Sequence, residues 1–311
     1  MTRPDLPTAV TIREVGPRDG LQAEAPLSVP DRIRLIDALS GCGFRKIEAV
    51  SFVSSKAVPA MAEASAVWAG IAKAESVEYS ALVPNRRGAE AALQAGGFAS
   101  LQAFLSASDG YNLKNVGKTV ESSMADVAGV VEVGTSAGVP VECSISAAFG
   151  DPYEGEVDPG TVVALAKRLV DAGVSSLSLG DTTGMATPGR VWDVAGRLME
   201  SLPRIALNLH FHDTRGTAMA NLLAALQAGV TEFDASVGGL GGSPFAPGAN
   251  GNLASEDAVH MLDDMGINTG VDLDRLLAAA RIAEELVGHP LHSQVSKAGP
   301  RRAAGRARGG S

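Results

Sequence analysis

Apolar and polar positions along the chain repeat with a period that predicts strands and helices in turn. Amphipathic segments of helix length separate short β-branched and apolar runs. Some helices should begin where a capping residue precedes proline, as at Asp158-Pro159 and Thr187-Pro188. The predicted strands lie near residues 10–15, 46–51, 78–83, 100–106, 140–147, 175–180, 205–211 and 231–237.

A recurring glycine marks the end of many predicted helices, in "SGCGF", "QAGGF", "SAGVP", "DAGVS" and "QAGVT". Each glycine suits a left-handed helix stop, and an apolar run follows it. Eight strands alternating with helices predict an α/β fold, a (β/α)₈ TIM barrel. "ASEDAVHMLDDMG" and "DLDRLLAAARIAEELVG" predict additional C-terminal helices. An open doubly wound sheet is the alternative, but no GxGxxG follows the first strand.

The organisation predicted is a single barrel domain over residues 1–292, because no low-complexity linker divides the chain. Residues 293–311 include "KAGPRRAAGRARGG", in which Gly, Ala and Arg lack apolar periodicity. We therefore expect a disordered basic tail after the barrel.

Charge and composition narrow the possible partners. The 311 residues carry a formal net charge of −9, which argues against nucleic acid as the main partner. No run has the length of a membrane span or a signal-peptide core. Cys42 and Cys143 form no CxxC pair, so we interpret both as reduced packing residues. These features predict a cytoplasmic protein without membrane partners.

Polar residues fall at the carboxyl ends of several predicted strands, where a barrel of this kind holds its chemistry. Arg18 and Asp19 follow the first strand, Glu48 lies on the second and Asp181 ends the sixth. Glu48 and Asp181 could support a site, act as a base or form rim salt bridges. Arg18 could stabilise an enolate oxygen or serve as a buried ion-pair partner.

The stretch "HFHD" ends the seventh predicted strand. His210 and His212 should face the same side, because alternate residues of a strand share a face. Two hydrogen-bonded interior histidines are one interpretation. The other is a metal site completed by Asp19 and Asn252, which would leave two open positions on a six-coordinate ion. That coordination suits Mg²⁺ or Mn²⁺ better than tetrahedral zinc.

A set of separated motifs resembles the 3-hydroxy-3-methylglutaryl-CoA lyase family of metal-dependent TIM-barrel lyases. The motifs are "EVGPRDGLQ", "IEAVSFVS", "PYEG", "SLGDTTG", "HFHDTRG", and "GLGGSPFAPGANGN" followed by "ASED". The resemblance implies a divalent metal on Asp19, His210, His212 and Asn252, an enolate-stabilising role for Arg18, and supporting carboxylates at Glu48 and Asp181. It also implies an acyl-CoA substrate and a possible homodimer.

The implied reaction is cleavage of a 3-hydroxyacyl-CoA to acetyl-CoA, or a homologue, and a keto acid or ketone. Lys114-Asn115 matches a family stretch near the CoA pocket, which favours CoA dependence. The alternatives are a 2-oxo acid aldolase or Claisen-type synthase on the same metal site, and a catalytically silent paralogue that binds an acyl-CoA.

Three positions depart from the family pattern. Ser243 replaces the cysteine of the glycine-rich loop, which the family uses as a general acid. A hydroxyl is far less acidic than a thiol of pKa about 8.5. Glu142 and Ser144 replace arginine and tyrosine on a face that should point into the barrel. An interior anion disfavours a substrate carboxylate nearby, unless a neighbouring Arg or Lys pairs with it.

Overall fold

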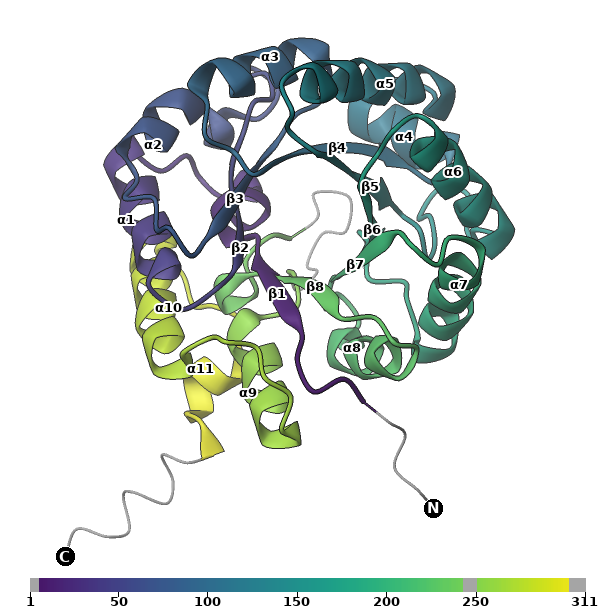
Figure 1. Cartoon of the computed structure of the whole chain (residues 1–311). Coiled ribbons are helices and arrows are strands. Elements are labelled where there is room, and N and C mark those ends of the chain that lie inside the picture. The colour runs from purple at the N-terminus through teal and green to yellow at the C-terminus, as the bar shows by residue number, and fades with distance from the viewer. Residues whose placement is uncertain (1–5, 243–250, 302–311) are drawn as a thin grey trace, which may run out of the picture.

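Eight parallel strands close into a barrel in the computed structural model, which describes residues 6–242 and 251–301. Each strand pairs with the next, and β8 pairs with β1 (Figure 1). Each predicted strand run overlaps the observed strand, and only the run near 175–180 ends one residue short of it, so the TIM-barrel prediction is confirmed. The strands are β1 (Thr11–Glu14), β2 (Lys46–Ser51), β3 (Glu78–Leu82), β4 (Ser100–Ser106), β5 (Val141–Ser146), β6 (Ser176–Asp181), β7 (Ala206–Phe211) and β8 (Glu232–Ala235).

Helices surround the barrel, and the additional C-terminal helices α9, α10 and α11 lie on its outside between α8 and α1 (Figure 1). The short turns η1 to η4 cover Gly16–Gly20, Leu21–Ala23, Pro59–Met61 and Val237–Gly239. The α-helices are α1 (Val29–Ser40), α2 (Ala64–Gly70), α3 (Arg86–Ala95), α4 (Asp109–Val116), α5 (Val120–Ser136), α6 (Pro159–Asp171), α7 (Pro188–Ser201), α8 (Ala218–Gln227), α9 (Ser255–Met265), α10 (Leu273–Val287) and α11 (Gln294–Ala298). No helix within the described ranges is long and apolar enough to cross a membrane.

The predicted helix starts are correct in position. Asp158 and Thr187 are the N-cap residues of α6 and α7, and proline follows each at the first turn. Neither side chain makes the expected capping hydrogen bond. Proline at the first helical position fixes a helical φ and leaves one fewer unpaired N–H group in the first turn, and these helices begin without a side-chain cap bond.

The glycine stops also occur as predicted. Gly43, Gly96, Gly138, Gly173 and Gly229 all have positive φ. Two features require glycine at position 43. Its φ is +93°, and a Cβ there would lie 2.4 Å from the carbonyl oxygen of Gly270. Glycine therefore permits both the turn and the close approach of the segment before α10.

The barrel strands have an apolar outer face and a polar inner face. On β5, Val141, Cys143 and Ile145 are buried in the core under the helices, whereas the residues between them are partly accessible. Arg13 of β1 reaches across the interior and donates to Gln102 of β4 and Glu142 of β5. A polar interior of this kind can receive a hydrophilic ligand, whereas barrels of this class are more often filled by branched apolar side chains.

A further short helix lies at the start of the predicted basic tail. Residues Gln294–Ala298 form α11, and its N-cap Ser293 accepts a hydrogen bond from the N–H of Ser296. Ser293 thus supplies a helix cap that the composition of the predicted tail does not reveal. Residues 302–311 lie outside the described residues.

Candidate metal and active site

Arg18 and Asp19 lie in a tight turn directly after β1. The turn η1 is one turn of π-helix, in which the N–H groups of Arg18 and Asp19 both donate to the carbonyl of Val15. Irregular helical turns of this type are frequent at functional sites. Both side chains are almost fully buried at the carboxyl end of the barrel.

His210 and His212 point toward each other, as the strand period predicted. Their Nε2 atoms are 3.1 Å apart, and His210 Nε2 is 3.8 Å from Oδ2 of Asp19. One ligand atom from each of the three residues lies within 4.8 Å of the others. Two imidazole nitrogens and a carboxylate that converge in this way can share one divalent cation.

Asn252 joins this group from the loop that follows β8. Residues 212 and 252 form an isolated antiparallel bridge, and Asn252 Nδ2 donates to Oδ2 of Asp19 at 2.7 Å. Its Oδ1 is buried and has no hydrogen-bond partner among the described residues. An unpaired buried acceptor is costly, and a cation would satisfy it. The four side chains therefore fit a divalent metal with oxygen and nitrogen ligands.

The orientation of His210 is set by a carboxylate on the neighbouring strand. Nδ1 of His210 lies 3.0 Å from Oδ2 of Asp234, and Arg13 donates to both oxygens of that carboxylate. Burial would raise the pKa of Asp234, but Arg13 and the His210 hydrogen bond outweigh burial and hold that pKa well below its ordinary value. An anionic Asp234 favours the His210 tautomer whose Nε2 can bind metal.

Neither Arg13 nor Asp234 was predicted as a site residue. The available signal was strand alternation, because Glu232 and Asp234 lie two apart on β8 and share a face. A charged residue two positions inside a strand of a parallel barrel needs a partner in the interior. That reasoning identifies Arg13 and Asp234 as interior residues, but it does not reveal that Asp234 contacts His210.

Arg18 is a buried cation held between two carboxylates. Its Nε donates to Oε2 of Glu48 at 2.5 Å and its Nη1 to Oδ1 of Asp19 at 2.8 Å. Burial raises the pKa of Glu48, and Arg18 opposes that rise. The two sequence interpretations of Arg18 are thus compatible, since the ion pairs orient a guanidinium that lies beside the metal ligands.

Asp181 ends β6 and organises the loop that follows it. Its Oδ1 accepts hydrogen bonds from the N–H groups of Met185 at 2.6 Å and Ala186 at 2.8 Å. Its Oδ2 is buried without a partner among the described residues. Burial raises the pKa of Asp181 to about 7. A carboxylate with a free oxygen and such a pKa is suited to accept a proton near neutral pH.

The comparison with protein families matches the HMGL-like model over residues 9–283. The chain belongs to the HMGL-like family. The resemblance deduced from the motifs is therefore confirmed.

Relatives of this HMGL-like chain share most of its length. It is 46% identical to hydroxymethylglutaryl-CoA lyase YngG of Bacillus subtilis, over 93% of this chain and 96% of that protein. It is also 46% identical to the mitochondrial hydroxymethylglutaryl-CoA lyase of Mus musculus, over 94% of this chain and 90% of that protein. The prediction that the chain is a carbon–carbon lyase of this family is confirmed.

Solved HMGL-like structures superimpose closely on the barrel. The crystal structure of the Bacillus subtilis HMG-CoA lyase gives a TM-score of 0.91 at 45% identity and covers 94% of this chain and 98% of that one. An HMG-CoA lyase from Acinetobacter baumannii, in complex with coenzyme A and 3-methylmalate, gives a TM-score of 0.90 at 39% identity. This match covers 94% of this chain and 96% of that one.

Glu142 and Ser144 lie on the inner face of β5, as predicted for the departures of this HMGL-like chain. Glu142 Oε2 accepts from Arg13 at 2.7 Å, and its Oε1 accepts from Ser100 at 2.8 Å. Glu142 is therefore not an isolated anion, because a neighbouring arginine pairs with it. Ser144 is partly accessible on the same face.

The other two expected substrate-binding residues lie on α4. Lys114 and Asn115 are exposed on α4, and Lys114 Nζ lies 5.9 Å from the ring centroid of Tyr153. Ser243 lies outside the described residues. The structure thus brings together Arg18, Glu48 and the four predicted ligands, and it leaves the two α4 residues exposed.

Proposed function

We propose that this chain cleaves a 3-hydroxyacyl-CoA of the hydroxymethylglutaryl-CoA type in a divalent-metal-dependent reaction. The products would be acetyl-CoA, or a homologue, and a keto acid or ketone. The observation that carries the proposal is the convergence of Asp19, His210, His212 and Asn252 beside the buried Arg18. The names of the relatives, and the coenzyme A and 3-methylmalate in one structural neighbour, support an acyl-CoA substrate.

Asp19, His210, His212 and Asn252 would hold the cation, with Mg²⁺ or Mn²⁺ favoured by the mixed oxygen and nitrogen donors. When bound, the cation polarises the substrate hydroxyl and a neighbouring carboxylate or carbonyl oxygen. Asp234 orients His210, and Asn252 Nδ2 orients Asp19 through its hydrogen bond. These contacts set the ligand positions before the cation binds.

The chain's own side chains provide the remaining steps. Oδ2 of Asp181 would take the proton of the 3-hydroxyl group, and the C2–C3 bond would break with its electron pair moving to the thioester enolate. The hydroxyl-bearing carbon becomes the carbonyl of the released product. Arg18, fixed by Glu48, would stabilise the enolate oxygen. Protonation of C2 completes the reaction; Ser243, at the position of the family's general acid, or another group of the site would donate this proton.

The charges of the barrel interior favour acyl groups without a distal carboxylate. Among the described residues, Arg18 is paired with Asp19 and Glu48, and Arg13 is paired with Asp234 and Glu142. Both interior arginines therefore already have two anionic partners. A neutral or hydroxylated acyl group would avoid competing with these carboxylates.

Mass spectrometry of acyl-CoA cleavage tests the proposal. Hydroxymethylglutaryl-CoA and 3-hydroxyacyl-CoAs that lack the distal carboxylate would be compared with Mg²⁺, with Mn²⁺ and with a chelator. We expect metal-dependent release of acetyl-CoA, and we expect His212→Ala to abolish both metal binding and release. Absence of cleavage of every substrate by metal-bound protein would contradict the lyase proposal.

Two broader expectations accompany this function. The family resemblance supports a homodimer, and the sequence supports a cytoplasmic location; analytical ultracentrifugation and cell fractionation respectively test them. The relatives include both mitochondrial and cytoplasmic proteins. No membrane or nucleic-acid partner is proposed.

A further inference from the structure

The peptide groups on both sides of Gly238, in the loop after β8, are held by distant parts of the chain. The N–H of Gly238 donates to the two carboxylate oxygens of Glu256 at 2.9 and 3.0 Å. Its carbonyl accepts from the N–H groups of His292 at 2.9 Å and Ser293 at 3.2 Å. Gly238 has a φ of +65°, and a Cβ there would lie 2.2 Å from Cδ1 of Leu291. The loop is thus fixed by α9 and by the C-terminal segment.

Residues 291–295, here called the C-terminal clip, are anchored to α9 by one carboxylate. Oδ1 of Asp257 accepts from Ser293 Oγ at 2.9 Å and from the N–H of Val295 at 2.8 Å. Its Oδ2 accepts from the N–H of Gln294 at 2.9 Å. Ser293 is fully buried, and Val295 is almost so. One side chain of α9 therefore holds three consecutive residues of the clip.

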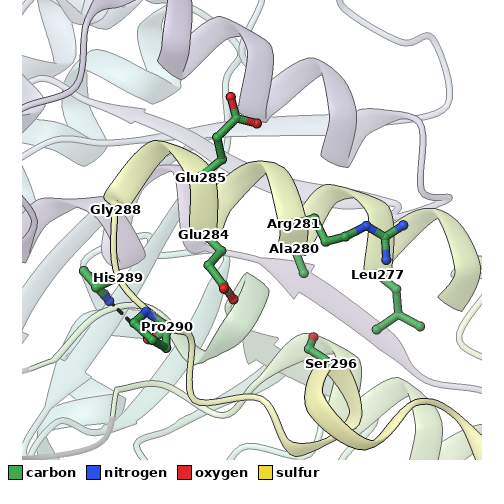
Figure 2. A pocket seen from close by; sticks show the side chains of 9 residues that line it. All are labelled: Leu277, Ala280, Arg281, Glu284, Glu285, Gly288, His289, Pro290 and Ser296. Carbon is green, nitrogen blue, oxygen red and sulfur yellow. Dashed lines mark hydrogen bonds between the residues drawn. The ribbon is translucent and has the colours of Figure 1, made fainter.

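A surface pocket borders the clip on the side of α10 (Figure 2). Leu277, Arg281 and Glu284 line it from α10, while His289, Pro290 and Ser296 line it from the residues that flank the clip. The residues that flank the clip thus border this pocket rather than packing continuously against α10. The clip itself is held by the hydrogen bonds to Asp257 and Gly238 and by the buried Leu291.

The held loop in turn contacts a proposed metal ligand. Leu240 follows Gly238 by two residues, and its carbonyl accepts from Nδ2 of Asn252 at 2.8 Å. Gly251 passes so close to Gly239 that a Cβ on it would lie 2.0 Å from the Gly239 carbonyl oxygen. Gly251, the residue directly before Asn252, is therefore packed against the loop, and a shift of the loop displaces the asparagine.

We propose that the C-terminal clip is a positioning element for the metal site. By holding Gly238, it fixes the loop that holds Asn252, although none of its residues belongs to the ligand group. This inference rests on the proposed role of Asn252 as a metal ligand. Loss of the clip contacts should weaken metal binding while the rest of the barrel stays folded.

The test compares Mn²⁺ affinity in two full-length variants of α9. Asp257→Asn removes the charge that anchors the clip, whereas Asp264→Asn, the control, removes an exposed carboxylate paired with Arg301. Electron paramagnetic resonance of free Mn²⁺ gives the Kd for each metal-free protein. We expect an increase of about 10-fold for Asp257→Asn, as for other residues that orient metal ligands, and less than about 2-fold for the control.

Limited trypsin cleavage at Lys297 reports whether the clip has detached, and Leu291→Ala provides a second route if Asp257→Asn fails to fold. Faster cleavage with an unchanged Mn²⁺ Kd in either folded variant would overturn the inference. If the unaltered protein fails to bind Mn²⁺, the proposed metal site itself is wrong and the inference falls with it. A Mn²⁺ Kd that rises in the clip variants but not in the control supports both the metal site and the positioning role of the clip.

Discussion

Asp234 links a buried arginine to a predicted metal ligand, since its carboxylate accepts from Arg13 at 2.8 and 3.0 Å and lies 3.0 Å from Nδ1 of His210. The carboxylate determines which imidazole nitrogen carries the proton and leaves Nε2 available to a cation. His212 has no equivalent partner among the described residues, because its Nδ1 is buried without a hydrogen bond. The two histidines therefore depend on different supports.

Asp234→Asn should weaken metal binding without removing a ligand. The amide carries no negative charge, so it stabilises the required His210 tautomer less well, and Arg13 loses part of its pairing. We expect the metal Kd to rise about 10-fold to 100-fold, measured by isothermal titration of the metal-free protein. Glu232→Gln, two residues earlier on β8, removes the partner of Lys46 and is the control. Equal affinities in the two variants would rule out an orienting role for Asp234.

Asp181 should cause the decrease of kcat on the acid side of the pH–activity profile. Burial raises its pKa to about 7, so the carboxylate form that can accept a proton is lost as the pH falls below that value. With metal saturating at every pH, kcat should rise as the pH increases through about 7 and then level. Asp181→Asn should lower kcat by about 10²-fold to 10⁴-fold and abolish this decrease at low pH. If Asp181→Asn keeps the same decrease of kcat at low pH, another group causes it.

Local sequence rules explain why the barrel could be predicted. The alternation on β5 places Cys143 and Ile145 in the core, and left-handed glycines such as Gly43 separate helix from strand. His210 on β7 and His212, which follows the strand in extended backbone, converge for the same reason, because alternate residues of an extended chain share one face. These features involve neighbours in sequence, and their physical cause is local backbone geometry.

The contacts that hold the site residues in place could not be predicted in the same way. Arg13 contacts Asp234 across 221 positions of sequence, and Gly238 is held by residues more than 50 positions later. Such pairs depend on barrel register and on the path of the C-terminal segment. Glu142 is an example. Its place on the strand predicts an interior anion, but only the closed barrel shows that Arg13 pairs with it.

Glu256 should make the metal-free protein less stable as the pH rises. Burial raises its pKa from 4.5 to about 8, so between these values the folded state binds a proton that the unfolded chain has lost. The free energy of unfolding therefore falls by at most about 1.4 kcal/mol per pH unit from this group and levels above pH 8. Urea unfolding of Glu256→Gln should give a flatter dependence between pH 5 and pH 8. Parallel curves for the variant and the unaltered protein would contradict the assignment.

Glu142→Gln should shift substrate preference toward acyl groups with a distal carboxylate. The change removes one interior anion, while Arg13 keeps its pairing with Asp234 and the fold keeps a side chain of the same size. The ratio of kcat/KM for hydroxymethylglutaryl-CoA to that for a 3-hydroxyacyl-CoA without the carboxylate should rise roughly 3-fold to 10-fold, the effect of one partly screened charge.

The matched control for this prediction is again Glu232→Gln, which removes an anion from the start of β8 rather than from the middle of the interior. Its ratio should stay within about 2-fold of that of the unaltered protein, because solvent screens a partly exposed ion pair. If both variants change the ratio equally, the effect comes from overall charge. If neither does, Glu142 serves only to pair with Arg13, and substrate selection lies in other residues of the barrel rim.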